Sequence, residues 1–260
     1  MRVLIIAPTN FQSYASSVLI ELLNNPKVNV VGVIVHKITL KRFKQEIRRD
    51  GKRIFWKIIN KAILRERNSL NFNFDTPKKR LNDQKIKANL KHICNENNLY
   101  FKEVEIFNSK KIVNEIKSLN LDVGAFCGGG ILRDNFLKSF SVGVLNCHMG
   151  ILPHYRGMDV VEWPFLENNH SEVGITCHLM DKGIDTGDII DIMKINYKDF
   201  KNFLEIREYL SFVMHEMMLK NIISIADDDY IRTSQLRDHG KQYFVMHDEL
   251  KKIASNNLYR

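Results

Sequence analysis

The sequence predicts an α/β fold, a Rossmann-like, doubly wound and mostly parallel sheet with a helical basic insertion and a small, mainly helical C-terminal region. The chain opens with two continuous apolar runs, at residues 2–8 and 28–36, which are typical of buried parallel strands. Apolar residues at helical spacing lie between them. This strand-helix-strand opening is typical of doubly wound sheets, and 260 residues suffice for one such domain with a small appendage.

The same alternation resumes after residue 100. Apolar patterns predict strands at 101–106, 121–127, 142–147, 174–180 and 189–197, and helices at 82–95, 109–119, 133–140 and 200–226. Residues 68–81 are polar and are predicted to form a loop, whereas an extended piece at 242–246 and a helix end the chain. We therefore expect one domain over residues 1–197, with a basic insertion at 37–92, and a C-terminal helical extension over 198–260.

Basic residues gather in one stretch of the chain. Of the net charge of +9, residues 37–92 contribute +13 from 18 Lys/Arg and 5 Asp/Glu, so the remainder carries −4. This distribution argues against a uniformly basic nucleic-acid-binding protein. Residues 41–67 are predicted to form one or two amphipathic basic helices. Three roles stay open for them: packing on the domain, weak contact with an anionic membrane surface, and closure over an anionic substrate.

Neither membrane insertion nor secretion is indicated. The longest apolar runs are strand-sized, far from the roughly 20 residues of a bilayer span, and the N-terminal apolar run is too short for a signal peptide. The four cysteines form no C-x-x-C pair, so we expect reduced, mostly buried thiols rather than a zinc site or a disulfide framework. A cytoplasmic location is therefore expected.

Three polar motifs follow predicted strands. The run Gly128-Gly129-Gly130 lacks both the G-x-G-x-x-G spacing and the P-loop ending, so it is either a tight turn or a ligand contact of another kind. Asn146 and His148 lie two residues apart and face one side of an extended segment, although either could simply bond loop backbone. The acidic turn at 183–188 lacks the further carboxylates of a calcium site.

Taken together, the stretches NCHMGILPHYRG at 146–157 and GIDTGD at 183–188 resemble the folate-dependent formyltransferases, and the resemblance covers roughly residues 1–197. That group includes methionyl-tRNA formyltransferase, glycinamide ribonucleotide transformylase and the sugar N-formyltransferases. The resemblance implies an enzyme that transfers a formyl group from N10-formyltetrahydrofolate, its cosubstrate, without a metal.

The resemblance also implies the site residues. The family's Asn, His and Asp correspond to Asn146, His148 and Asp185, the expected catalytic trio. The residues expected to bind the folate are Gly128, Gly129, Gly130, Ile131, Leu132, Met180, Asp181, Gly183 and Ile184. The residues expected to bind the second substrate are Asn10, Tyr155, Arg156 and Gly157. Among them, Arg156 suits an anionic substrate, because a guanidinium matches the geometry of phosphate.

These residue types suit the chemistry of formyl transfer to an amine. The amide of Asn146 and the ring of His148 offer N–H groups to the oxyanion that forms when the amine attacks, each worth about 3–4 kcal/mol in comparable sites. Asp185 orients His148 and helps to relay the amine's proton through water. The remaining histidines, His178 among them, are expected to be surface or core residues.

The identity of the amine depends on what the chain lacks. Residues 7–12 do not form the glycine-rich phosphate turn of the glycinamide ribonucleotide enzymes. The 63 residues after Tyr197 are too few for the β-barrel domain of methionyl-tRNA formyltransferase. We expect a sugar N-formyltransferase that acts on a dTDP- or GDP-linked 4-amino-4,6-dideoxy sugar for surface polysaccharide such as O-antigen, works as a homodimer and binds no nucleic acid. The alternatives are an atypical methionyl-tRNA formyltransferase and a non-catalytic folate or nucleotide-sugar binder.

Overall fold

The computed structural model describes residues 1–37, 39, 74–236 and 238–259, and within them a seven-stranded sheet has the order β3-β2-β1-β4-β5-β7-β8. Its strands are β1 (Arg2–Ala7), β2 (Asn29–His36), β3 (Tyr100–Val104), β4 (Leu121–Phe126), β5 (Phe140–His148), β7 (Gly174–Leu179) and β8 (Ile189–Lys194). The first five strands are parallel, whereas β7 is antiparallel to both β5 and β8. The predicted doubly wound, mostly parallel sheet is confirmed.

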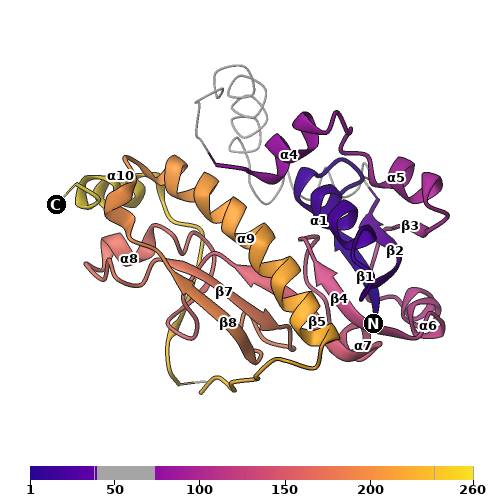
Figure 1. Ribbon diagram of the computed structural model, residues 1–260. Coiled ribbons are helices and arrows are strands. Elements are labelled where there is room, and N and C mark those ends of the chain that lie inside the picture. The colour runs from indigo at the N-terminus through magenta and orange to yellow at the C-terminus, as the bar shows by residue number, and fades with distance from the viewer. Residues whose placement is uncertain (38, 40–73, 237, 260) are drawn as a thin grey trace.

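Helices cover both faces of this sheet (Figure 1). On one face, α1 (Ser13–Leu23), α5 (Leu90–Glu96) and the long α9 (Phe203–Ala226) share one apolar core with the sheet. On the other face, α6 (Lys110–Ser118) and the short α7 (Asp134–Leu137) enclose a second core. Alternate residues of a strand point to opposite faces, so each strand contributes to both cores.

The region before β3 differs from the prediction. The expected loop at 68–81 contains the start of α4 (Pro77–Asp83), because the Thr76 side chain accepts from Lys79 N and Pro77 suits a first helical turn. The expected helix at 82–95 is divided, since α4 ends at Asp83 and α5 begins after a new N-cap, Asn89. The amphipathic helices predicted at 41–67 lie outside the described residues.

Short elements after β5 were missed or misplaced. The strand β6 (Tyr155–Gly157) pairs in parallel with β9 (Lys241–Tyr243), which starts earlier than the predicted piece at 242–246. The α8 helix (Trp163–Leu166) was not predicted, and the strand expected to reach residue 197 ends at Lys194, before a 3-10 turn at Tyr197–Asp199. A strand of three residues shows too little periodicity to be recognised from the sequence. Its partner strand also lies far away in the chain.

The residues after 197 are closely joined to the sheet. α9 packs against β4, β5, β7, β8 and α1, and the last helix, α10 (Asp248–Asn257), packs against α8. Between these helices, β9 pairs with β6, which forms the end of the motif at 146–157. No helix among the described residues is long and apolar enough to cross a membrane, and all four cysteines are free and buried.

Candidate active site

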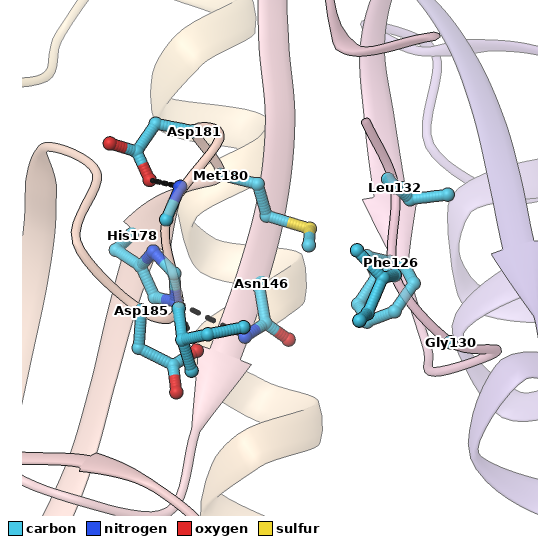
Figure 2. A pocket seen from close by; sticks show the side chains of 11 residues that line it. Phe126, Gly130, Leu132, Asn146, His178, Met180, Asp181 and Asp185 are labelled. Atoms are coloured by element: carbon cyan, nitrogen blue, oxygen red, sulfur yellow. Dashed lines mark hydrogen bonds and ion pairs between the residues drawn. The ribbon is translucent and has the colours of Figure 1, made fainter. Parts of the chain in front are cut away.

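A pocket of about 160 Å³ opens where the carboxyl half of β5 meets the loops after β4 and β7. It is lined by Phe126, Gly130, Ile131, Leu132, Asn146, His178, Met180, Asp181, Gly183, Ile184 and Asp185. Figure 2 shows Phe126 and Leu132 on one side, and Met180, His178 and Asp185 on the other, with Asn146 between them. The pocket is therefore an apolar slot with an amide, an imidazole and a carboxylate at one end.

The antiparallel pairing of β5 with β7 brings the polar groups together. Asn146 lies opposite His178 and His148 opposite Thr176, so these four side chains share one face of the sheet. The alternate residues, Leu145 among them, point into the core beneath α1 and α9. One strand therefore supplies both core and site, and a register shift of one residue would move Asn146 to the wrong face.

The sequence analysis missed two residues that line the pocket, the apolar Phe126 and the polar His178. The side chain of His178 is almost fully buried, at 1% exposure, and Nδ1 lies 3.1 Å from the Leu179 carbonyl oxygen, which can only accept. Nδ1 therefore carries a proton, and in the neutral ring Nε2 accepts from the Asn146 amide nitrogen at 3.1 Å. This contact orients the Asn146 amide and leaves its second N–H to face a ligand. The available sequence signal was the two-residue spacing between His178 and Met180, which places both side chains on one face of an extended segment.

Asp185 sits between two imidazole rings. Its Oδ1 lies 3.5 Å from His178 Nε2 and its Oδ2 lies 3.6 Å from His148 Nδ1, while the Gly157 N–H donates to Oδ2 at 2.9 Å. The residue has a φ of 53°, in the left-handed region, which costs a non-glycine residue about 1 kcal/mol. The surrounding contacts offset this cost and aim the carboxylate at the pocket.

These contacts set the charges of the site. Burial alone would raise the pKa of the Asp185 carboxyl. When the imidazoles are protonated, a hydrogen bond from His178 and the charges of both rings, together with the Gly157 N–H, outweigh burial and lower this pKa to about 2. Burial lowers the pKa of His148, and the Asp185 carboxylate and the Tyr155 carbonyl oppose this only in part. At neutral pH the site therefore combines an ionised carboxylate with a neutral His148.

His148 supports the pocket from behind and does not line it. Its Nε2 lies 2.9 Å from the carbonyl oxygen of Tyr155, so Nε2 donates its proton to that oxygen. Nδ1, which faces Asp185, is then the unprotonated nitrogen. In this geometry the N–H of His148 is occupied by Tyr155, and the ring acts on the pocket through Asp185. The side-chain N–H that remains available to the pocket comes from Asn146.

Seven of the nine residues predicted to bind folate line the pocket, namely Gly130, Ile131, Leu132, Met180, Asp181, Gly183 and Ile184. Gly128 and Gly129 lie just before it and, with φ values of 105° and 133°, turn the chain away from the end of β4. In the facing loop, Asp181 Oδ1 accepts from Gly183 N and Thr186 Oγ1. A side chain at Gly187 would collide with the Leu179 carbonyl, which explains the glycine of the D-T-G motif.

The four residues predicted to bind the second substrate are engaged by the protein. Asn10 bonds to Asn89 and to Lys91 N at the start of α5, and Gly157 bonds to Asp185. Tyr155 is buried, stacks on Tyr243 and donates its hydroxyl to Glu167. Arg156 is also buried and bonds to Gln235 and the Leu236 carbonyl. A substrate contact for these side chains stays a prediction, and it would require some of these bonds to be exchanged.

No group of three His, Cys, Asp or Glu side chains in the described residues is arranged to hold a metal ion.

The low pKa of Asp185 predicts a pH effect on stability. The unfolded carboxyl binds its proton near its usual pKa of 3.8 and the folded one only near 2, so the folded state loses about 2 kcal/mol relative to the unfolded state as the pH falls through this window. Asp185→Asn should remove this loss, whereas Asp83→Asn, at an exposed position, should not. Urea unfolding between pH 5 and 2 measures the free energy of unfolding as a function of pH. The same pH dependence in wild type and Asp185→Asn would contradict the ion-pair geometry.

Comparison with known proteins identifies the family of this chain. The formyl transferase family model matches residues 1–222. Methionyl-tRNA formyltransferase from Clostridioides difficile (strain 630) is 27% identical over 165 residues, which are 63% of this chain and 53% of that protein. The matched part of this chain spans about half the length, or less, of these curated relatives.

Two solved structures show the same fold. A sugar N-formyltransferase from Shewanella sp FDAARGOS_354 has a TM-score of 0.59 at 16% identity, over 99% of this chain and 87% of that chain. WlaRD, a sugar 3N-formyl transferase solved in the presence of dTDP and 5-N-formyl-THF, has a TM-score of 0.54 at 18% identity, over 100% and 79%. The family match covers most of the chain, including both sequence motifs and the whole pocket, and the protein therefore belongs to the formyl transferase family.

Proposed function

We propose that this protein is a sugar N-formyltransferase that moves a formyl group from N10-formyltetrahydrofolate to the amine of a nucleotide-linked 4-amino-4,6-dideoxy sugar. The observation that carries the proposal is the pocket, in which Asn146 and Asp185 stand at the end of an apolar slot. Family membership supports formyl transfer as the reaction.

The pocket suits the folate in shape and in chemistry. Phe126, Leu132 and Met180 provide apolar surface for a flat ring, and the loop at 180–185 offers backbone groups for its polar edge. The folate supplies the formyl group when bound. WlaRD was solved in the presence of 5-N-formyl-THF, which supports a formyl folate as the cosubstrate of this chain.

Asn146 is proposed to stabilise the charge that develops on the formyl oxygen. His178 holds one of its N–H groups, so the second keeps a defined direction. A donor fixed before the reaction does not have to reorganise as the charge develops, and one such donor contributes about 3–4 kcal/mol in comparable sites. We assign this role to the amide, because the ring N–H of His148 already donates to Tyr155.

Asp185 and His148 are proposed to manage the proton of the attacking amine. The ionised Asp185 attracts the positive charge that grows on the nitrogen during attack. The unprotonated Nδ1 of the neutral His148 can take the proton through water, and Asp185 then stabilises the imidazolium that forms. This proposal keeps the three expected residues but changes the role of His148, which acts as a base instead of donating an N–H to the oxyanion.

The amine is the finer part of the proposal. The likeness to sugar N-formyltransferases extends over the whole length of the chain, and WlaRD was solved with dTDP, which favours a nucleotide-linked amino sugar. We propose a dTDP- or GDP-linked sugar used in surface polysaccharides such as O-antigen and lipopolysaccharide, and a homodimeric enzyme. The curated relatives favour a second candidate, charged initiator tRNA. A folate or nucleotide-sugar binder without turnover is the third.

A substrate panel separates these functions. Enzyme and N10-formyltetrahydrofolate are incubated with dTDP- and GDP-linked 3-amino and 4-amino sugars, and with methionyl initiator tRNA. Mass spectrometry should detect a gain of one formyl group on a 4-amino sugar nucleotide. Formyl-methionyl-tRNA without any sugar product would overturn the substrate proposal, and binding of either ligand without turnover would overturn the enzymatic one.

The roles of the trio predict the effects of substitution. Asn146→Ala and Asp185→Ala should each lower kcat by about 10²-fold or more, while folate binding changes only a few-fold, because the lost interactions form mainly in the transition state. Near-normal kcat in either variant would remove that residue from the mechanism. Circular dichroism serves as the folding control.

His148 predicts the pH dependence. Because burial lowers its pKa, the neutral form needed as a base persists below the usual value of 6.5, and kcat/KM should fall only at more acidic pH. His148→Ala should lower kcat by about 10²-fold or more and abolish this acid limb. An acid limb centred above pH 6.5 in wild type, or an unchanged limb in the variant, would contradict the assignment.

His178 predicts a further effect in the same assay. His178→Ala removes the acceptor of the Asn146 amide and one partner of Asp185, so kcat should fall by about 10-fold or more. His178→Gln, whose amide can reach both partners, should retain more activity. His92→Ala, on the exposed side of α5, serves as the matched control. Equal kcat for His178→Ala and His92→Ala would show that His178 is only a core residue.

A further inference from the structure

A segment beyond the family-matched residues 1–222 runs beside the loop that carries Asp185. Thr233 and Ile189 exchange two backbone hydrogen bonds of 2.9 Å, and Ser234 Oγ donates to Asp188 at 3.0 Å. Gln235 comes next and reaches further along the same loop, to Gly187 and Asp185. Residues 233–235 therefore run antiparallel to this loop, from the start of β8 to the backbone of Asp185.

The Gln235 amide is bonded on both of its ends. Its Nε2 donates to the carbonyl oxygen of Asp185 at 3.1 Å and to that of Gly187 at 2.6 Å. Its Oε1 accepts from Nε and Nη2 of Arg156, at 3.4 and 3.2 Å. Carbonyl oxygens only accept and a guanidinium only donates, so this arrangement fixes which end of the amide points where.

Arg156 anchors the other end of this contact. It is 5% exposed, and its Nη2 also donates to the Leu236 carbonyl, so the guanidinium holds the segment by both side chain and backbone. Arg156 directly precedes Gly157, whose N–H donates to Asp185 Oδ2. The carboxylate of Asp185 is thus held by the N–H of Gly157, and the backbone carbonyl of Asp185 is held by the side chain of Gln235.

We propose that Gln235 is a positioning residue of the formyl-transfer site, through which the C-terminal segment keeps Asp185 in its left-handed backbone conformation. The inference rests on the proposed function of Asp185. A carbonyl oxygen is fixed by the backbone angles around it, so bonding the carbonyls of Asp185 and Gly187 restrains the φ and ψ angles that aim the carboxylate. Gln235 does not line the pocket, and its proposed effect on the reaction is transmitted through the backbone of Asp185.

Kinetics of the full-length protein provide the first test. Gln235→Ala should lower kcat for formyl transfer by about 10- to 100-fold, because small misplacements of a reacting group have effects of that size, with KM changed by less than about threefold. Gln235→Glu should be at least as damaging, since a carboxylate would face two carbonyl oxygens. Gln242→Ala, at an exposed glutamine of β9, is the matched control and should behave as wild type.

A double-mutant cycle separates positioning from general damage. If Gln235 acts through Asp185, adding Gln235→Ala to Asp185→Ala should lower kcat by less than about twofold further. Losses that simply multiply would overturn the proposal, as would a kcat of Gln235→Ala equal to that of Gln242→Ala.

Hydrogen exchange tests the same claim without turnover. The Gly157 amide reports on Asp185, because it donates to Oδ2, and its exchange should be about 10-fold faster or more in Gln235→Ala while global stability is unchanged. Unchanged exchange at Gly157 would overturn the positioning role even if the enzyme is active. Faster exchange in a protein that formylates no amine would support the positioning role and sink the proposed function instead.

Discussion

The structure of this site depends on the placement of one carboxylate between two imidazole rings. Asp185 lies within 3.6 Å of His148 Nδ1 and 3.5 Å of His178 Nε2, in a backbone conformation that is unfavourable for it. Each imidazole ring is oriented by a hydrogen bond to a backbone carbonyl. His148 bonds to the carbonyl of Tyr155, and His178 bonds to that of Leu179. The charge and direction of Asp185 therefore follow from the pairing of β5 with β7 and from the bonds that close the loop after β7.

The sheet serves stability and chemistry through the alternation of its strands. On β5, Leu145 and Cys147 enter the core beneath α1 and α9, while Asn146 and His148 point to the opposite face. Substitutions that disturb the core beneath β5 are therefore expected to reach the site through the strand itself. The loops after β4 and β7 then complete the pocket from two sides, so residues from three separate stretches of the chain line it.

The sequence predicts the parallel sheet and most pocket residues, because long apolar runs and glycine-bounded motifs carry strong local signals. It does not predict His178, since a single histidine on an apolar strand resembles a core residue until its partner strand is known. The parts played by Arg156 and Gln235 are equally hidden, because they depend on a contact between residues 79 positions apart. The division of α4 from α5 depends on a single N-cap, Asn89, within a polar stretch that favours neither helix nor loop.

The measurement that tests this account most directly is the protonation state of the two histidines around Asp185, read from ring nitrogen chemical shifts by NMR at pH 7.5. The account predicts a neutral His148 that carries its proton on Nε2, and a His178 that carries one on Nδ1. In Asp185→Asn, the pKa of His148 should fall further, because the carboxylate that favours the imidazolium is gone. A His148 that is protonated on both nitrogens at pH 7.5, or one whose proton sits on Nδ1, would contradict the arrangement from which the function is derived.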